Sequence, residues 1–576
     1  MNRSMRTRAH RIIAAVVTAL ALLSLAACAT LPTAGDVRPG LSADDRDAES
    51  DVTYVPNGPS PGADAEQIVR GFIDAASSPV ENWGIAQQFL APGFSQKWKP
   101  HAGVTIDSSF SERAYTVLDV DEAATDHTVQ LTLSQTASVD ENGAYTSIVG
   151  SARKAELLFE VEQNAEGEWR ITAAPDGIVL DLQSFASGDV YQSYALQYFD
   201  LTWSRMVPDV RWFPKRKNTP ARIVQALAAG APSAWLTDSV RTVFAGDIEL
   251  GSDAVPVEAQ IAQVSLGPGA ANADPLVLSR ARTQLERSLV GTGVVEVRLS
   301  VGTRPIEAGI VPVGSTAVDS RPLVEAGDKF GFLMGGEVVS VPVLSAELGA
   351  FEAPLRSVVA AVADGHAAVQ TETGTVYAID EGRVDEIDSR PGLIAPTMDP
   401  FGFIWTVPAA APSGLIAWTQ DVTPHPVAAF ADVSGVSHLA VSREGARAAA
   451  VVTVGSQYQV EVLGITRSDG GVPTSLGPPM ALSWLPGPAL GLVWLDDRTL
   501  GILARDGDDT VLIEQPVGGP GRTIDVPDDA YALAASSPST SVRLLGEGGV
   551  LYSRSGPSWQ AERAQVQVLA TQLGGS

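Results

Sequence analysis

The side chain with the most readily assigned chemistry is the thiol of Cys28, the single cysteine among 576 residues. It follows a run over residues 12–23 that is apolar except for Thr18, and the small residues Ala26 and Ala27. Four arginines precede that run: Arg3, Arg6, Arg8 and Arg11. A basic start, an apolar stretch of about a dozen residues and small residues before a break form a secretory signal peptide. The run is shorter than the roughly 20 residues that span a bilayer, so we expect residues 1–27 to be cleaved off.

The residues before the cysteine indicate a more specific chemistry. Leu25, Ala26 and Ala27 followed by Cys28 resemble the bacterial lipobox. That motif implies an S-diacylglycerol group on the Cys28 sulfur and an acyl chain, such as palmitate, on its amino group. Several acyl chains, at about 0.8 kcal/mol per buried CH₂, anchor a protein where one chain does not. We therefore predict a lipoprotein on the outer side of the cell membrane; the alternative is an ordinary signal peptide with a chance cysteine at its end.

A second segment matches the sequence pattern of a catalytic motif but lacks a group that the motif's chemistry needs. Gly58-Pro59-Ser60-Pro61-Gly62 matches the G-x-S-x-G nucleophile elbow. In that motif the residue after the serine donates its backbone N–H to an oxyanion hole, and Pro61 has no N–H. No strand pattern precedes the segment. We treat the match as false.

The histidines and acidic turns do not form a metal motif either. His101, His127, His366, His425 and His438 show no H-x-x-x-H spacing and there is no cysteine near them, so we expect no transition-metal centre. The segment 506–509, Asp-Gly-Asp-Asp, could contact calcium, but Asp-Gly is first a hairpin-turn signal. The sequence predicts no catalytic residue, no metal and no cofactor, and we expect the protein not to be an enzyme.

Length and composition describe a large globular protein that carries a strong negative charge. Its 576 residues predict three or four domains, and 45% hydrophobic with 18% charged residues is typical of folded chains. The net charge is −28, and it becomes −32 without the four arginines of the signal peptide. This charge disfavours nucleic acid and anionic lipid headgroups as partners. With the lone cysteine lipidated, no disulfide is expected.

The chain after the cysteine divides into a tether and a first folded unit. Residues 28–62 are rich in proline and contain the acidic run 44–51, which predicts an extended, solvated tether. Apolar residues at helical spacing from Ala65 to Ala76 predict an amphipathic helix, and a second helical stretch contains Trp83 and ends at Pro92-Gly93. Alternating residues around Leu131, Phe159 and Ile171 then predict antiparallel strands. We expect an α+β domain over 63–180, of a small cone-shaped type similar to NTF2.

The next unit, over 190–305, alternates strands and helices. Strands are expected at 194–199, 255–266 and 295–301, and residues 207–214 are expected to form a turn that leads into an edge strand. Thr219-Pro220 predicts the N-cap and first turn of one helix, which Gly230 closes, and Asp274-Pro275 predicts the start of another helix, which runs to Leu289. The order β-α-β-α-β indicates a compact α/β or α+β domain.

From Val311 to the end, residues 311–576, the sequence is β in character. Short apolar runs alternate with turn residues, as in a sandwich or a propeller. An apolar, acidic-turn, apolar hairpin pattern recurs every 40 to 50 residues, at 399–405, 442–448 and 494–500. This is the blade period of a β-propeller, and the length allows about five or six blades. Trp405, Trp418, Trp484, Trp494 and Trp559 could anchor an interface, although a place in the blade cores is the favoured interpretation.

Several of these segments carry a resemblance to a known family. Residues 211–214 (Arg-Trp-Phe-Pro), 223–227 and 229–236, which contain Gly-x-Pro-Ser-x-Trp-Leu, are similar to the GerMN domain of the actinobacterial LpqB lipoprotein family. Residues 65–98, the lipobox and the order of the units resemble that family too. The resemblance implies a GerMN domain followed by a propeller-like domain.

The resemblance also implies a partner. Members of the family act as accessories of the MtrA–MtrB two-component system in cell-envelope growth and division, and contact the extracytoplasmic part of the sensor histidine kinase. We therefore expect a non-enzymatic, membrane-anchored regulator of such a kinase. The alternative is a protein that binds peptidoglycan or another cell-wall glycan. A hydrolase with a site split between domains is the third hypothesis, although the sequence offers no carboxylate pair or Ser/His pair for it.

Overall fold

The computed structural model describes residues 56–574 except 119–123, 151, 245, 247, 539, 557 and 564. The predicted signal peptide, the lipobox with Cys28 and most of the tether lie outside these residues. The described residues belong to one compact unit, Val55–Ser576. Within it, no helix of the described part is long and apolar enough to cross a membrane.

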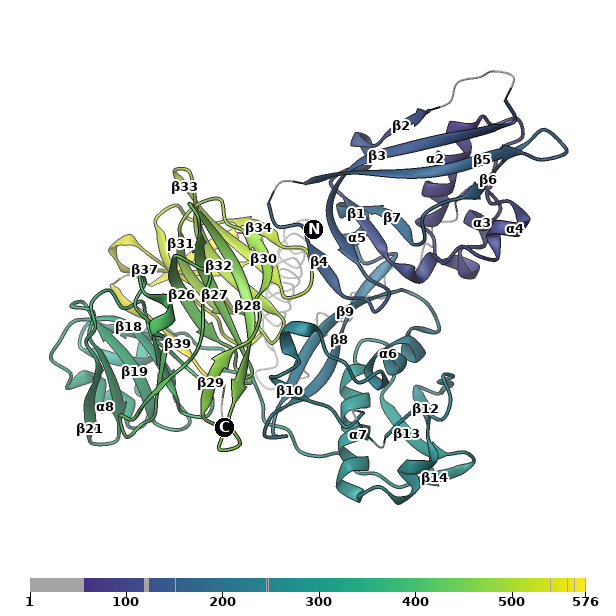
Figure 1. Ribbon diagram of the computed structural model, residues 1–576. Helices are drawn as coiled ribbons and strands as arrows, with labels where there is room; N and C mark the ends of the chain where they lie inside the picture. The colour runs from purple at the N-terminus through teal and green to yellow at the C-terminus, as the bar shows by residue number, and fades with distance from the viewer. Residues whose placement is uncertain are drawn as a thin grey trace, which may run out of the picture. The chain divides into compact units, whose positions relative to one another are not determined.

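The N-terminal domain packs one amphipathic helix on a curved sheet (Figure 1). Helix α2 (Ala65–Ala76) begins at a capping box in which Asp64 and Gln67 bond each other's backbone N–H, and it buries Ile68, Val69 and Phe72. The sheet has the order β6-β5-β3-β1-β7, with β2 and β4 also paired to β3. The strands are β1 (Val104–Asp107), β2 (Ala114–Val117), β3 (Asp126–Val139), β4 (Tyr145–Ser147), β5 (Arg153–Gln163), β6 (Trp169–Ala173) and β7 (Ile178–Asp181), followed by helix α5 (Leu182–Ala186).

This domain confirms the predicted helix and the strands β3, β5 and β6, and corrects two details. The sheet is not purely antiparallel, because β1 pairs with β7 in parallel register. The second helical stretch is broken into the 3-10 turn Val80–Asn82 and helix α3 (Gly84–Gln87), with left-handed backbone at Glu81, Asn82 and Trp83. Pro92 then opens a further short helix, α4 (Pro92–Ser95), because proline at the first helical position lacks only an N–H that the helix does not use.

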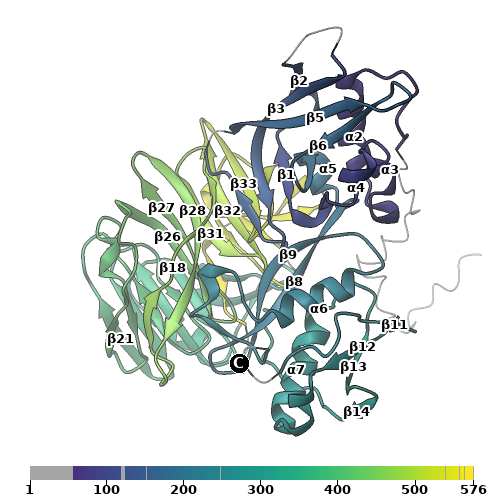
Figure 2. The ribbon, with the colours of Figure 1, turned by 45° about the vertical axis from the view of Figure 1, so that its right-hand side comes forward.

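The middle domain has two small sheets and two helices, α6 and α7. One sheet has the order β10-β8-β9 and the other has the order β11-β12-β13-β14 (Figure 2). Strands β12 and β13 pair in parallel, and helix α7 connects them along the chain. The elements are β8 (Tyr191–Asp200), β9 (Met206–Pro214), α6 (Thr219–Ala228), the 3-10 turn Ala234–Leu236, β10 (Val240–Arg241), β11 (Val257–Glu258), β12 (Ile261–Leu266), α7 (Pro275–Ser288), β13 (Glu296–Val301) and β14 (Arg304–Ile306).

Three sequence predictions for this domain need correction. The residues 207–210 belong to strand β9 and do not form a turn. Asn218, not Thr219, is the N-cap of α6, because the Thr219 hydroxyl donates to the Pro214 carbonyl instead of capping the helix. The strand expected over 255–266 is a hairpin, since Ala259 and Gln260 turn the chain with φ of 47° and 65°. The cap at Asp274 is confirmed by its bond from the Leu276 N–H.

The C-terminal domain is a β-propeller whose described residues form six four-stranded blades. Blade 1 is β39 (Val566–Gln572), β15 (Leu323–Ala326), β16 (Lys329–Met334) and β17 (Glu337–Val339); blade 2 is β18 (Leu355–Ala361), β19 (His366–Thr371), β20 (Val376–Asp380) and β21 (Arg383–Asp388); blade 3 is β22 (Thr397–Met398), β23 (Ile404–Thr406), β24 (Ile416–Trp418) and β25 (Pro424–Pro426). Blade 4 is β26 (Gly435–Val441), β27 (Arg447–Val454), β28 (Gln457–Arg467) and a split outer strand, β29 (Pro473–Leu476) and β30 (Met480–Trp484); blade 5 is β31 (Ala489–Trp494), β32 (Thr499–Asp506), β33 (Asp509–Pro516) and β34 (Arg522–Asp525); blade 6 is β35 (Ala530–Ala534), β36 (Arg543–Gly546), β37 (Val550–Ser555) and β38 (Ser558–Arg563).

The innermost strands close into a ring. Strands β18, β22, β26, β31, β35 and β39 each lie beside the next, and β39 also lies beside β18. The last strand of the chain, β39, therefore completes the first blade by pairing with β15. The region is not entirely β as predicted, since helix α8 (Leu344–Gly349) lies between blades 1 and 2.

The recurring hairpins predicted from the sequence are the connections between the first two strands of blades 3, 4 and 5. Because neighbouring strands of a blade are antiparallel, these hairpins all lie at the same end of the ring. We call this end the hairpin face, which includes 399–403, 442–446, 495–498 and the turn 517–521. The opposite end, where the innermost strands begin, is the entry face, with the loops 327–328, 350–354, 372–375, 389–396, 407–415, 427–434, 455–456, 485–488, 507–508, 526–529 and 547–549.

Candidate functional site

Trp212 is the point at which all three domains meet. Its backbone N–H donates to the Gly143 carbonyl of the N-terminal domain at 2.8 Å. Its ring packs against Phe185 of the same domain, with centroids 4.3 Å apart. Its indole Nε1 donates to the Gly518 carbonyl of the propeller at 2.7 Å. Trp212 belongs to β9 of the middle domain and is only 9% exposed. Its packing therefore couples the positions of the three domains.

A buried ion pair, formed by residues that precede Trp212 in strand β9, stabilises this junction. Asp209 and Arg211 are paired at 2.8 Å, with both side chains almost fully buried. The Asp209 carboxylate also accepts from the Ser233 N–H and hydroxyl, each at 2.8 Å. Arg211 donates to the Asn142 carbonyl of the N-terminal domain at 3.3 Å. Asp209 thus bridges Arg211 and Ser233, which lie in two segments that carried the family resemblance, and Arg211 also bonds the neighbouring domain.

The hairpin face of the propeller receives the middle domain. Arg447 is fully buried, is paired with Glu444 at 2.7 Å, and donates to the Pro208 carbonyl at 3.4 Å and the Asp497 carbonyl at 2.6 Å. The strand β28 passes so close to the middle domain that a Cβ added at Gly464 would lie 2.7 Å from the Trp235 carbonyl oxygen. These contacts occupy the hairpins of blades 4 and 5.

Blade 3 contributes to the same interface. The Arg205 guanidinium of the middle domain lies over the Phe401 ring, 5.3 Å from its centroid. The carboxylate behind that ring, Asp399, accepts from Arg467 at 2.6 Å and from the Trp405 indole at 3.2 Å, which fixes the hairpin. A large hydrophobic core runs across the interface and contains residues of the middle domain and of blades 4 and 5. The repeated hairpins therefore act as a docking surface inside the molecule.

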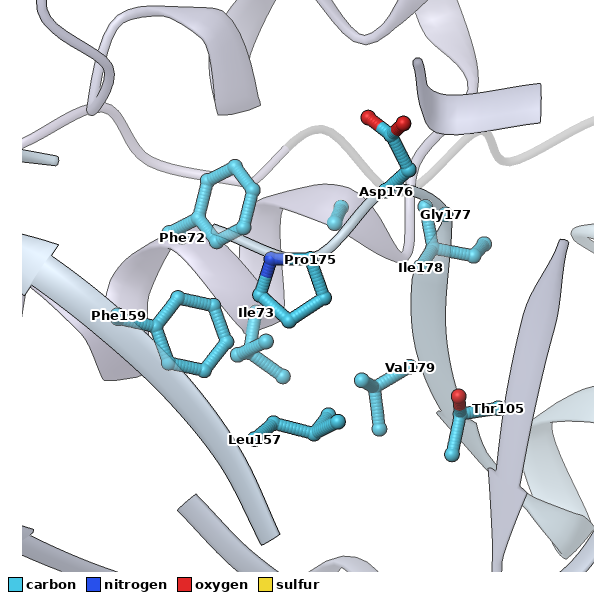
Figure 3. Close-up of a pocket in the computed structure, with 11 residues that line it drawn as sticks. Phe72, Ile73, Thr105, Leu157, Phe159, Pro175, Asp176, Gly177, Ile178 and Val179 are labelled. Carbon is cyan, nitrogen blue, oxygen red and sulfur yellow. The ribbon is translucent and has the colours of Figure 1, made fainter. Parts of the chain in front are cut away.

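The N-terminal domain contains a small apolar hollow. About 320 Å³ of space, part of it open to solvent, lies between α2 and strands β1, β5 and β7. Figure 3 shows the rings of Phe72 and Phe159 beside it and the carboxylate of Asp176 pointing away from them. Asp176 accepts a bond from the Lys99 N–H. The lining offers no acid and base facing each other, and so no general acid–base chemistry.

The predicted histidines lie apart from this hollow and from each other. His101 packs edge-on against Trp83 at 4.9 Å, and burial, helped by Arg222 and Arg216, lowers its pKa to about 4. His127 stacks on Trp169 at 4.8 Å. In the propeller, His366 lies 3.3 Å from Asp380 and His425 packs against Phe403 at 6.0 Å. No group of three or more metal-ligating side chains occurs among the described residues.

Other sequence candidates have structural positions. Residues 58–60 form a loop and Gly62 donates to the Glu168 carboxylate, so the G-x-S-x-G spelling is not an elbow. Gly507 has φ of 62° in the turn between β32 and β33, as predicted for a hairpin. Trp405 and Trp494 are buried at 1% and 4%, whereas Trp418, Trp484 and Trp559 are partly buried.

The entry face carries a feature that the sequence analysis missed. In five of the six described blades, the register at the start of the innermost strand shifts by one residue, which leaves Arg356, Ser437, Leu490, Tyr531 and Gln567 unpaired opposite their neighbours. Bulges of this kind re-aim side chains and are over-represented at sheet edges, at the rims of barrels and next to active sites. Their equivalent positions become visible only once the blades are aligned in space, because the five residues share no side-chain type.

Comparison with known proteins is consistent with this architecture. The family profile described as "Lipoprotein LpqB, N-terminal domain" matches residues 58–186, and the one described as "Lipoprotein LpqB beta-propeller domain" matches residues 335–568. Together these stretches make up more than half of the chain.

Individual relatives match at moderate identity. Lipoprotein LpqB of Bifidobacterium longum (strain NCC 2705) is 28% identical over 304 residues, which is 51% of this chain and 49% of the relative. Lipoprotein LpqB of Nocardia farcinica (strain IFM 10152) is 26% identical over 327 residues, 54% of this chain and 51% of the relative. The chain thus spans about half the length of the curated relatives it matches.

Among solved structures, TolB from Acinetobacter baumannii aligns with 80% of this chain and 83% of its own, at 13% identity and a TM-score of 0.32. A TM-score this low does not show that the two proteins share a fold. The two family profiles carry the assignment, and they match the N-terminal domain and the propeller in the order that the structure has them. The chain belongs to the LpqB lipoprotein family.

Proposed function

We propose that the protein is a lipid-anchored, extracytoplasmic and non-enzymatic accessory of a two-component sensor histidine kinase of the MtrA–MtrB type. In this proposal residues 1–27 are removed, Cys28 carries the lipid on the outer side of the cell membrane, and residues 28–62 are a tether. The folded body then comprises an NTF2-like domain (63–180), a GerMN domain (190–305) and the propeller (311–576). The partner is the extracytoplasmic domain of the kinase, and the accessory acts in cell-envelope growth and division.

The observation that carries the proposal is the arrangement of the propeller faces within a member of the LpqB lipoprotein family. The hairpin face is occupied by the chain's own middle domain through Arg447, Phe401 and Gly464. Within the described residues, the loops of the entry face make no hydrogen bond or ion pair to the other two domains, so this face is the better candidate surface for another protein. The apolar hollow of the N-terminal domain has no acid–base pair, which favours a binding role over catalysis.

Such an accessory changes signalling only if it binds two states of the kinase domain with different affinity, because equal affinity shifts no equilibrium. The tether would let the body reach a domain that stands above the membrane. Its negative charge would keep the body away from anionic headgroups.

Affinity capture from solubilised membranes tests the proposal. The full-length protein, tagged at its C-terminus, would be purified in mild detergent and the retained proteins quantified by mass spectrometry. We expect near-stoichiometric recovery of one sensor histidine kinase, at a level at least tenfold above that for an unrelated lipoprotein with the same tag. Recovery of wall fragments without a kinase would contradict the proposal and favour the glycan-binding alternative.

A further inference from the structure

We infer that the entry face of the propeller is the surface that docks the partner, and that the partner presents a basic protein surface to it. This inference rests on the proposed function for the identity of the partner.

The first step is that, in the described part of the chain, the middle domain docks on the hairpin face, while beside the entry face Gly150 of the N-terminal domain lies next to Trp484 at the outer edge of blade 4. Polar contacts between the propeller and the middle domain involve the hairpin face, as with Arg447 to Pro208 and Trp212 to Gly518. The linker also lies near this end, since the Val318 N–H donates to Ser537 in the loop between β35 and β36. Among the described residues, no hydrogen bond or ion pair joins the loops of the entry face to residues 56–310.

The second step is that the open end places recognition side chains around the axis. Arg356 and Tyr531 occupy bulges on β18 and β35, and Tyr531 is 41% exposed. Tyrosine and arginine are enriched among residues that dominate the free energy of protein binding. In a regular strand, side chains alternate between the two faces of the blade, and both faces pack against neighbouring blades. The bulge interrupts this alternation at Arg356 and Tyr531.

The innermost strands lie side by side around the ring, so the bulged residues at their first ends come from different blades but lie at one end of the axis. Burial, followed by the nearby charge of Glu372 in blade 2, raises the pKa of Tyr531 in blade 6. Burial also lowers the pKa of His438 in blade 4 to about 4, with Arg356 of blade 2 adding to the effect and the Leu490 backbone opposing it. Charged side chains of blade 2 therefore influence the pKa of residues in blades 4 and 6. The centre of the entry face is therefore a mixed polar cluster with an accessible aromatic ring.

The third step is the charge of the rim. The exposed carboxylates of the entry face are Asp328, Glu352, Glu372, Asp432, Asp506, Asp508, Asp509, Asp528 and Glu547, whereas its exposed bases are Lys329 and Arg356. None of these carboxylates is in an ion pair with another described residue. A rim of one sign steers an oppositely charged partner and disfavours like charge.

The negative charge of the rim determines which class of partner the entry face favours. Anionic lipid headgroups and nucleic acid carry the same sign as the rim, and so does the acidic run 44–51 of the chain itself. A basic protein surface is complementary, with the aromatic and polar cluster at the axis supplying the contact that fixes its register. The chemistry fits a folded domain or loop that presents several Lys or Arg side chains.

Binding of the purified extracytoplasmic domain of the MtrB-type kinase from the same organism tests the inference. The full-length lipoprotein would be held in detergent micelles, and Kd would be measured at several salt concentrations. The test variant neutralises three rim carboxylates, Asp506→Asn, Asp508→Asn and Glu547→Gln. The matched control neutralises three exposed carboxylates on the N-terminal sheet, Glu156→Gln, Glu160→Gln and Glu162→Gln. A second pair compares Tyr531→Ala with Phe110→Ala, a ring of the N-terminal domain that is 55% exposed against 41% for Tyr531.

We expect the rim variant to bind about tenfold more weakly at low salt and to lose most of its salt dependence, and Tyr531→Ala to lose about tenfold at all salt concentrations. Both controls should bind within about twofold of the wild type. Equal effects of test and control variants, or no effect of either test variant, would overturn the inference while leaving the proposed function intact. Failure of the wild-type protein to bind the kinase domain would overturn the proposed function, and this inference with it.

Discussion

At the scale of single residues, Trp212 has the largest structural consequence. Replacing it with alanine removes the ring packed on Phe185 and the bond to Gly518, and we expect a loss of about 3 to 5 kcal/mol in the free energy of unfolding. Trp212→Phe keeps an aromatic ring but leaves the Gly518 carbonyl unpaired, with a loss of about 1 to 2 kcal/mol. Calorimetry should resolve separate transitions for the alanine variant. A single transition at the wild-type temperature would contradict the role of Trp212 as a junction.

The buried carboxyl group of Glu461 should make the stability of the protein depend on pH. It is 4% exposed on β28, and burial raises its pKa to about 7. Between the ordinary pKa of about 4.5 and 7, the folded protein holds a proton that the unfolded chain releases, so stability is lost as the pH rises through this range. We expect Glu461→Gln to stabilise the protein at pH 8, by as much as about 3 kcal/mol, and to have no such benefit at pH 4. Urea unfolding at both pH values measures this, with the exposed Glu156→Gln as the control; a gain that does not depend on pH would contradict the assignment.

Cys28 is the residue on which the predicted anchoring depends. Without its thiol, no diacylglyceryl group can be attached, so we expect Cys28→Ala to be released from the membrane while its folded body is unchanged. Cell fractionation and intact-mass analysis measure the two effects. A variant that remains acylated and sediments with membranes would show that the anchor lies elsewhere.

At the scale of elements, strand β39 closes the propeller. Val568 is 3% exposed and pairs with Glu325 of β15, whereas its neighbour Gln567 is the exposed bulge residue. A buried unpaired carboxylate is far more costly than an exposed one. We expect Val568→Asp to destabilise the propeller by more than about 3 kcal/mol and Gln567→Asp by less than about 1 kcal/mol. Thermal unfolding distinguishes the two, and similar losses would mean that β39 is not essential to the ring.

Elements whose residues carry a local signal could be predicted from the sequence. Helix α2 has its capping box at Asp64, helix α7 has Asp274, and the blade hairpins repeat at a fixed period. The split of 255–266 could not be foreseen, because Ala259 and Gln260 are not typical residues for a turn with positive φ. The start of α6 was predicted one residue too late, since the hydroxyl of Thr219 is already bonded to Pro214.

Pairings between distant segments could not be predicted. The parallel pairing of β1 with β7 joins Val104 to Ile178, and the closure of blade 1 joins Leu323 to Ala570, at sequence separations for which one sequence has no signal. The repeated hairpins indicated a propeller, but their second role as the docking surface for the middle domain depends on contacts such as Arg447 with Pro208. The candidate site was missed for the same reason, because its bulged residues are of unrelated types.

At the scale of the whole molecule, the middle domain docks on one propeller face, and the described residues of the other two domains make no hydrogen bond or ion pair to the loops of the opposite face. Segments around Trp212 and Ser233, whose residues carry the family resemblance, hold the domains together. This arrangement presents the acidic rim and Tyr531 on a fixed body instead of on a mobile module. Rigid presentation reduces the entropy lost when a partner binds.

Photo-crosslinking in living cells tests the central claim most directly. A photoreactive amino acid would replace Tyr531 on the entry face, and in a matched strain Leu158, a 52% exposed residue on the N-terminal sheet. Crosslinked products would be identified by mass spectrometry. We predict that position 531 captures the sensor histidine kinase through its extracytoplasmic domain and that position 158 does not. Capture of the kinase from position 158 but not from position 531 would contradict the account.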